Sequence, residues 1–208
     1  MFYFLTVIAL FLHADKLIAQ HSVCHTPFLR LHTLEYENSS GEKAITTFHY
    51  HENGLMDKAT WECTDGSCRS NNFYRYNDKK QLTSAYREFT NGLTSYEIFL
   101  YNDAGNKTHE TFLRSDGVTG TADYYYDKHN QCIRVNCNRY KGWITGDIIY
   151  RRKKKNTCVQ SADIINKDET IGSIAFEYDE ENNLIKDVWT FENGFIQTFL
   201  YHYENIDN

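Results

Sequence analysis

The sequence predicts an all-β protein, a repetitive antiparallel β-meander of about 14–15 strands that forms one strongly curled single sheet. Three observations support this fold class. Aromatic and β-branched residues alternate with polar ones, a unit of about 25 residues recurs, and glycine recurs at a fixed place in that unit. The 208 residues include 16 Tyr and 13 Phe but a single Pro. This composition favours strands over helices.

A tyrosine anchors each unit, and the steps between anchors are 26, 25, 25, 24, 28 and 25 residues. The anchors are Tyr50, Tyr76, Tyr101, Tyr126, Tyr150, Tyr178 and Tyr203. A second large apolar residue stands two positions earlier in every unit: Phe48, Tyr74, Phe99, Tyr124, Ile148, Phe176 and Tyr201. Because residues two apart share one face of a strand, each unit presents two large groups to one side. The residue between them varies freely, which is typical of a half-buried strand.

Glycine follows the anchor by sixteen residues in five units, as Gly66, Gly92, Gly117, Gly142 and Gly194. Asn or Asp precedes it in four of these five. Asn-Gly and Asp-Gly are the favoured two-residue hairpin turns, in which both central residues take positive φ. An earlier turn is expected four residues past the anchor, at Gly54, Gly105, Asn130 and Asn182. Each unit therefore predicts a strand, a short turn, a longer strand and a tight turn.

Extending the repeat spacing backward gives a degenerate first copy that begins at His25. The chain then has seven units and a last strand. Flat open sheets of so many strands are rare, and one aromatic face must be covered. We therefore expect the sheet to wrap around its own aromatic side. The alternatives are a partly closed barrel, two packed sheets or a flat single layer.

The N-terminus carries an apolar run at residues 2–12, which is too short to span a bilayer and matches the core of a secretory signal. We expect a signal peptide over 1–19 and one repeat domain over 20–208. No Lys or Arg precedes the run, so a buried strand or a misassigned start is the alternative. The context of Cys24 predicts no lipid anchor. The net charge of −6 disfavours nucleic acid as a partner. The expected location is secreted, periplasmic or outer-envelope.

The six cysteines all follow the expected cut, which fits an oxidising compartment, with free thiols in the cytosol as the alternative. A two-residue turn at Asp65 and Gly66 would place Cys63 opposite Cys68 in a non-hydrogen-bonded pair. That spacing suits a disulfide. We predict a structural Cys63–Cys68 bond. The pairing stays open for Cys24, Cys132, Cys137 and Cys158.

Two groups of residues are candidates for contact with a ligand or partner. Five consecutive cations occupy a turn of the irregular fifth unit: Arg151, Arg152, Lys153, Lys154 and Lys155. They fit either a solvated hairpin tip or contact with an anionic surface. Four aromatic residues lie off or at the edge of the regular positions: Tyr125, Tyr140, Trp143 and Phe195. If exposed, they would stack on sugar rings or pack on a partner, and core positions are the alternative.

No catalytic or cofactor motif occurs in the sequence, and no metal site is expected. His49 and His51 share a strand face, but the repeat places no further ligand beside them, so we expect surface histidines.

The copies at 99–106, 124–131 and 176–184 resemble the YD repeat of the RHS class, through the step from Tyr to Asn or Asp and the Gly or Asn that follows. The turns at 53–55, 91–93 and 193–195 are similar to MORN-type repeats. The resemblance implies a bacterial exported β-repeat protein. Large RHS proteins form a β shell around a toxin domain, but this chain is too short for such a shell.

The leading functional hypothesis is a non-enzymatic exported repeat protein whose β surface binds a glycan or another envelope or secreted protein. The first alternative is an immunity or antitoxin-like partner of a toxin, which the MORN-like turns suggest. A further alternative is an enzyme with a site in the concave aromatic trough. Neither a cofactor nor a nucleic-acid partner is expected in any of these.

Overall fold

The computed structural model describes residues 29–140, 144–152 and 158–206. The predicted signal peptide over 1–19, Cys24, Trp143 and the three lysines at 153–155 lie outside these described residues. In the described part the chain forms fourteen strands. They are β1 (Leu29–Asn38), β2 (Lys43–Tyr50), β3 (Met56–Cys63), β4 (Arg69–Tyr76), β5 (Leu82–Phe89), β6 (Thr94–Tyr101), β7 (Lys107–Arg114), β8 (Thr119–Tyr126), β9 (Cys132–Tyr140), β10 (Ile144–Arg151), β11 (Ser161–Asn166), β12 (Glu169–Tyr178), β13 (Leu184–Phe191) and β14 (Ile196–Asn205).

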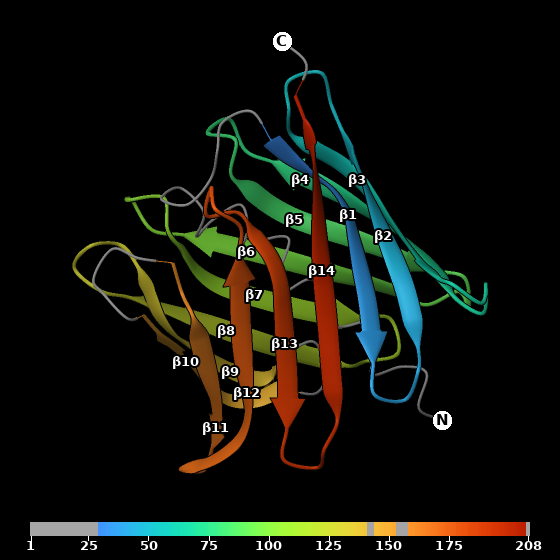
Figure 1. Ribbon diagram of the computed structural model, residues 1–208. Helices are drawn as coiled ribbons and strands as arrows, with labels where there is room; N and C mark the ends of the chain where they lie inside the picture. Colours follow the sequence, from blue (N-terminus) through green and yellow to red (C-terminus); the bar gives the residue numbers. More distant parts are fainter. Residues whose placement is uncertain (1–28, 141–143, 153–157, 207–208) are drawn as a thin grey trace.

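Every strand pairs antiparallel with the next, and β1 also pairs with β14, so the sheet closes into a barrel. In Figure 1 the near wall of β13, β14, β1 and β2 runs steeply, and strands of the far wall cross behind it. The predicted all-β antiparallel meander is confirmed, and the curl continues until the edges meet, as in the barrel alternative. The flat single layer is wrong, because closure covers the aromatic face and removes both edges. No helix among the described residues is long and apolar enough to cross a membrane.

The inner face of the barrel carries the core, as the alternation of the units predicts. In β6 the buried residues are Ser95, Glu97 and Phe99, and the residues between them are exposed. One hydrophobic cluster joins inward side chains from all around the barrel. Trp189, Phe199 and Ile164 are among its fully buried members.

A β-bulge recurs in the odd-numbered strands just after each short turn. Tyr50 pairs with Met56 while His49 pairs with Lys58, so Asp57 is an extra residue. The same shift occurs where β4, β6, β8 and β12 meet the next strand. The bulge changes the parity of the strand, so Met56 and Trp61 both face inward although they are five residues apart.

The turns after β3, β5, β7 and β13 correct the prediction of two-residue turns. The loop after β3 has four residues between its hydrogen-bonded ends, Cys63 and Cys68, and the other three loops have three residues each. In each loop glycine alone has positive φ, for example 71° at Gly66. The preceding Asp or Asn instead accepts the backbone N–H two residues on, as Asp65 does from Ser67 at 2.9 Å. These residues are therefore selected for their side-chain acceptor, which closes an Asx turn, and glycine supplies the left-handed residue.

Anchor tyrosines tie successive units together through their hydroxyl groups. Tyr50 donates to the carbonyl of Leu31 at 2.6 Å, and Tyr101 donates to that of Leu82 at 2.8 Å. Tyr126 and Tyr203 make the same bond, again to the residue nineteen positions earlier. We call these four bonds the tyrosine clasps. Burial raises the pKa of Tyr50, Tyr126 and Tyr203 above the ordinary value, so these hydroxyls stay protonated donors.

The predicted Cys63–Cys68 disulfide is present, with its Cα atoms 5.3 Å apart. The pair differs from the expectation in one respect, because the N–H of Cys63 donates to the carbonyl of Cys68. The four-residue loop shifts the pairing into this hydrogen-bonded position. Cys158 also belongs to a disulfide. Cys132 and Cys137 are buried thiols.

Candidate functional site

A cavity of about 390 Å³ opens at the end of the barrel where the turns follow odd-numbered strands. We call it the mouth cavity. Its wall comes from β10 to β14 and from the turn between β1 and β2. The lining residues are Ser40, Ile144, Thr145, Ile164, Asn166, Ile171, Phe191, Asn193, Phe195 and Gln197. A volume of this size suits a small ligand or one end of a longer one.

No charged side chain is among the described residues that line the mouth cavity. Half of its residues are Ile or Phe, and the other half are Ser, Thr, Asn or Gln. An ion entering this cavity would lose hydration without meeting an opposite charge, which is costly. The cavity therefore suits a neutral ligand that has both apolar faces and hydrogen-bonding groups.

Gln197 is the most deeply buried polar residue of the cavity, with 1% of its surface exposed. Its Nε2 donates to the hydroxyl of Tyr36 at 3.3 Å, and Asn38 donates to the same oxygen at 2.9 Å. The Oε1 atom of Gln197 is buried and has no hydrogen-bond partner. A buried acceptor left unpaired costs about 1–3 kcal/mol. A ligand that donates a hydroxyl or N–H group there would remove this cost.

Two phenylalanines supply the aromatic side of the mouth cavity. The rings of Phe191 and Phe195 lie 6.2 Å apart, and Trp189 lies 6.3 Å behind Phe191. The Asn193 side chain of the same turn holds the loop by accepting the N–H of Phe195 at 3.0 Å. The Asn-Gly turn thus holds Phe195 at the rim, where its side chain lines the cavity.

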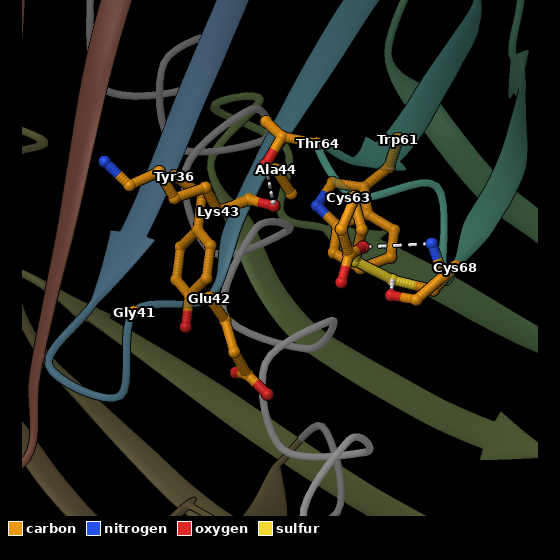
Figure 2. A pocket seen from close by; sticks show the side chains of 11 residues that line it. Tyr36, Gly41, Glu42, Lys43, Ala44, Trp61, Cys63, Thr64 and Cys68 are labelled. Carbon is orange, nitrogen blue, oxygen red and sulfur yellow. Dashed lines mark hydrogen bonds between the residues drawn. A yellow bond between two sulfur atoms is a disulfide. The ribbon is translucent and has the colours of Figure 1, made fainter.

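A smaller cavity of about 80 Å³ lies at the same end of the barrel, beside the disulfide. We call it the disulfide cavity. Figure 2 shows Tyr36 and Trp61 on two sides of it, with Glu42 extending from the turn between β1 and β2. Trp61 is 2% exposed, and its indole Nε1 is buried without a partner. Each cavity is therefore lined by a residue that has a buried, unpaired polar atom, a donor on Trp61 and an acceptor on Gln197.

The interior of β5 to β9 holds a fully buried group of charges, which we call the charge cluster: Arg87, Glu97, Lys107 and Glu110. Lys107 Nζ lies 3.1 Å from Glu110 Oε2, and Tyr124 and Tyr140 donate to the Glu110 carboxylate at 2.9 and 2.6 Å. Burial, and then the nearby Glu110 charge, raise the pKa of both tyrosines well above the ordinary value. These donors enclose the carboxylate, as a structural network requires.

Arg87 completes the charge cluster. Its Nε donates to Asn72 Oδ1 at 2.6 Å, and its guanidinium carbon lies over the Phe89 ring, 5.2 Å from the centroid. Burial lowers the pKa of Arg87 to about 10, which leaves it charged at neutral pH, and Glu97 opposes this shift. On the other wall, Asp187 accepts from Trp189 at 2.9 Å and from Tyr201 at 2.5 Å. Glu110 and Asp187 are therefore bound by protein donors, and neither is among the described residues that line the two cavities.

The predicted contact residues have separate positions in the structure. Tyr125 is 45% exposed on the outer face of β8, with the Arg134 guanidinium 4.9 Å from its ring centroid. Arg151 pairs with Asp163, and Arg152 donates to the carbonyl of Cys132 at 3.0 Å. The two described cations of the run therefore make contacts within the barrel wall. The other three lie outside the described residues.

Tyr140 is not an exposed aromatic, because it is fully buried and bound to Glu110. A bulge explains the difference. Arg139 has a φ of 47°, and two residues of β9 lie opposite one residue of β10 between the pairs Cys137–Gly146 and Tyr140–Ile144. The extra residue turns Tyr140 inward, where regular alternation would have pointed it outward.

His49 and His51 both lie at the surface of the barrel. His51 lies 3.3 Å from Asp57 at the surface, and both side chains are about half exposed. No group of three or more His, Cys, Asp or Glu among the described residues is arranged to hold a metal ion. The described residues therefore contain no metal centre.

A row of aromatic residues that was not predicted from the sequence crosses the outer face of the barrel. The register aligns Phe73, Tyr86 and Tyr96 on β4, β5 and β6, with ring centroids 6.4 and 4.7 Å apart. Beside it, Ile98 and Leu100 are 51% and 53% exposed. We call these five residues the outer patch. Cross-strand aromatic pairs stabilise sheets, so the row has a structural role in addition to any contact.

Comparison with known proteins gives remote similarities only. No family model and no curated protein matches the sequence. Among solved structures, the chain is similar to a porin-like protein from Bacteroides uniformis ATCC 8492, with 14% identity, a TM-score of 0.44, and coverage of 86% of this chain and 98% of that one.

Two further similar structures are complexes named TcdB2-TccC3-Cdc42 and TcdB2-TccC3-TEV. The first has 16% identity, a TM-score of 0.36, and coverage of 70% of this chain but 7% of the other. The second has 13% identity, a TM-score of 0.27, and coverage of 79% and 10%. We take no activity or partner from similarities this remote. The YD-type and MORN-type resemblances stay predictions.

Proposed function

We propose that this protein is an exported, non-enzymatic binding protein whose mouth cavity takes a neutral glycan. One observation carries the proposal: Gln197, whose amide oxygen Oε1 is buried and unpaired, lines a cavity whose described lining has an aromatic side and no charged side chain. A ligand for this cavity must donate a hydrogen bond, present an apolar face and carry no charge. Sugar rings combine hydroxyl donors with apolar C–H faces that pack on aromatic rings.

The test is a glycan array followed by titration calorimetry with the best ligand. Gln197→Leu should weaken binding by about tenfold, because the ligand loses its buried acceptor. It should leave stability nearly unchanged, since the unpaired oxygen is removed as well. Thr198→Ala, on the outer face of the same strand, is the matched control and should bind normally. The proposal is contradicted if the protein binds no neutral glycan, or if the Gln197→Leu variant binds the glycan as tightly as the unchanged protein does.

The non-enzymatic part of the proposal rests on how the described carboxylates are used. Glu42 and Asp65 are the acids that line the disulfide cavity. Glu42 accepts from the Asn38 amide at 2.6 Å, and hydrogen bonds from Ser67 lower the pKa of Asp65. A general acid needs a raised pKa, so Asp65 is not suited to that role. Chromatography of the bound glycan after long incubation should recover it intact, and cleavage products would favour the enzyme alternative.

A protein partner is the second candidate, and the outer patch favours it. Tyr96, Ile98 and Leu100 are each about half exposed on one strand. Exposed apolar groups gathered in one place are typical of protein interfaces. This version includes an envelope or secreted partner and an immunity role toward a toxin. Ile98→Lys should abolish a complex with the product of a neighbouring toxin gene, whereas Ile185→Lys on β13 should not. Retention of the complex by Ile98→Lys excludes this surface.

Export and the anionic-surface contact complete the proposed function. The location would be secreted, periplasmic or outer-envelope, which the Cys63–Cys68 disulfide supports because such bonds persist in oxidising compartments. Contact of the run at 151–155 with an anionic surface would depend on its three lysines, since Arg151 and Arg152 already have protein partners.

A further inference from the structure

The indole N–H of Trp61 is a hydrogen-bond donor for which the barrel supplies no acceptor. Trp61 pairs with Thr46 on β2 and with Ser70 on β4, and all three side chains point inward. None of their polar atoms, Nε1 of Trp61 included, has a hydrogen-bond partner. An indole N–H can only donate, and Trp61 lines the disulfide cavity, so water or a ligand in that cavity is the candidate acceptor.

The size of the disulfide cavity limits what can enter. Its volume of about 80 Å³ is a fifth of that of the mouth cavity. It has room for two or three water-sized groups, on the order of 30 Å³ each. A whole sugar ring does not fit in this space. A short substituent with an oxygen at its end does.

The charges around the disulfide cavity exclude an anionic substituent. Glu42, Lys43 and Asp65 line it. The ammonium of Lys43 already lies 3.1 Å from Glu37, and the pKa of Asp65 is lowered by its hydrogen bonds to Ser67, so Asp65 is ionised. A carboxylate or phosphate would meet a net negative field. A neutral carbonyl oxygen would not, and it accepts an N–H bond equally well.

The two cavities adjoin the same turn and share one hydrogen-bond chain. Ser40 lines the mouth cavity, and its neighbours Gly41 and Glu42 line the disulfide cavity. Tyr36 lines the disulfide cavity and accepts the Gln197 amide that lines the mouth cavity. A single ligand seated over the turn between β1 and β2 would therefore reach both.

We propose that the disulfide cavity is a subsite for the carbonyl of an acetamido group, with Trp61 Nε1 as its donor, so that the glycan carries an N-acetylated sugar. The inference rests on the proposed function, because the sugar ring itself occupies the mouth cavity. Trp61 supplies the hydrogen bond to the carbonyl, and the short methyl end packs beside the disulfide.

The experiment follows the indole N–H resonances of ¹⁵N-labelled protein by NMR, with the Trp61 signal assigned from Trp61→Phe. Di-N-acetylchitobiose should shift the Trp61 signal saturably, and cellobiose should not. The Trp189 indole, which donates to Asp187 at 2.9 Å, is the internal control and should not shift. Calorimetry should show a preference of about tenfold for the acetylated sugar, lost in Trp61→Phe.

Each outcome decides a separate point. Equal binding of both sugars, with a normal effect of Gln197→Leu, overturns the subsite and leaves the proposed function standing. A Trp61 shift with N-methylacetamide, in a protein that binds no glycan, supports the subsite and refutes the glycan function. A Trp61 signal that no probe moves means that the cavity holds bound water only, and the subsite is then overturned.

Discussion

The charge cluster and the mouth end of the barrel lie in the same interior but differ in how their polar groups are partnered. In the charge cluster, Glu110 receives Lys107 and two tyrosine hydroxyls. At the mouth end, an acceptor on Gln197 and a donor on Trp61 are buried without partners. Paired buried groups hold a fold in one arrangement, whereas an unpaired group beside a cavity is ready for a ligand. The difference separates the structural polar residues from the candidate binding residues.

High pH should break the paired region most strongly. Burial raises the pKa of Tyr124, Tyr140 and Tyr201, so these tyrosines keep their protons in the folded state and lose them when unfolded. Above about pH 10 the unfolded state binds fewer protons, so stability falls as pH rises. By pH 11 these three alone should cost about 4 kcal/mol.

The measurement is urea unfolding between pH 8 and about 11, beside absorbance of tyrosinate in the native protein. Below about pH 9 the tyrosine contribution should be constant. Tyrosines that ionise near pH 10 while the protein is still folded would contradict the expected shift.

Lys107→Met tests the charge cluster directly. It leaves the Glu110 carboxylate buried without its cation, which should lower the free energy of unfolding by about 3–5 kcal/mol. Adding Glu110→Gln removes the orphaned charge, keeps an acceptor for one tyrosine and offers an amide N–H to the hydroxyl oxygen of the other, and should restore about half of the loss. Lys186→Met, at a surface pair with Glu177, is the control and should cost under about 1 kcal/mol. Denaturant midpoints that do not separate Lys107→Met from this control would refute the paired-cluster interpretation.

Gly146→Ala should disturb the wall of the mouth cavity. Gly146 has a φ of 118°, and an added Cβ would lie 2.1 Å from the carbonyl oxygen of Ile165. The cost should be at least about 2 kcal/mol, and glycan binding should weaken because the neighbouring Thr145 lines the cavity. Gly92→Ala, at positive φ with open space around it, should cost about 1 kcal/mol and leave binding unchanged. Equal midpoints in thermal unfolding for the two variants would contradict this.

Tyr101→Phe should have the smallest effect. It removes one tyrosine clasp, the bond to the Leu82 carbonyl, and should cost about 1 kcal/mol without changing glycan affinity. Tyr96→Phe removes a hydroxyl from a half-exposed ring and should be neutral. Paired denaturant curves decide the matter, and a clasp variant as stable as Tyr96→Phe would mean that the clasps add nothing.

Much of the fold follows from the sequence because its unit repeats with a strict strand alternation. The clasps were also available from sequence. All seven anchors are Tyr, whereas the position two residues earlier accepts Phe, Tyr or Ile. Constant selection for a hydroxyl indicates a hydrogen bond. The recurrent bulge left a signal as well, because apolar residues six and eleven past the anchor, such as Met56 and Trp61, cannot share a face in a regular strand.

The candidate site could not be predicted in the same way. Gln197 and Tyr36 are 161 residues apart, and they meet only because β14 closes against β1. Alternation within a unit specifies which side chains face inward, but it does not specify whether the two sheet edges join. Gln197 and Trp61 have unpaired polar atoms because the side chains packed around them offer no partner. Which side chains lie there is decided by packing and by bulges, such as the one that turns Tyr140 inward.

The seam between β1 and β14 gives the barrel a late step in folding. The two strands come from opposite ends of the described chain, and Leu29 pairs with Asn205 at one end of the seam. Hairpins can form one by one as the polypeptide emerges, but the ring stays open until the final strand arrives. Removal of β14 would therefore expose two strand edges at once and uncover the apolar interior, which would favour pairing between molecules.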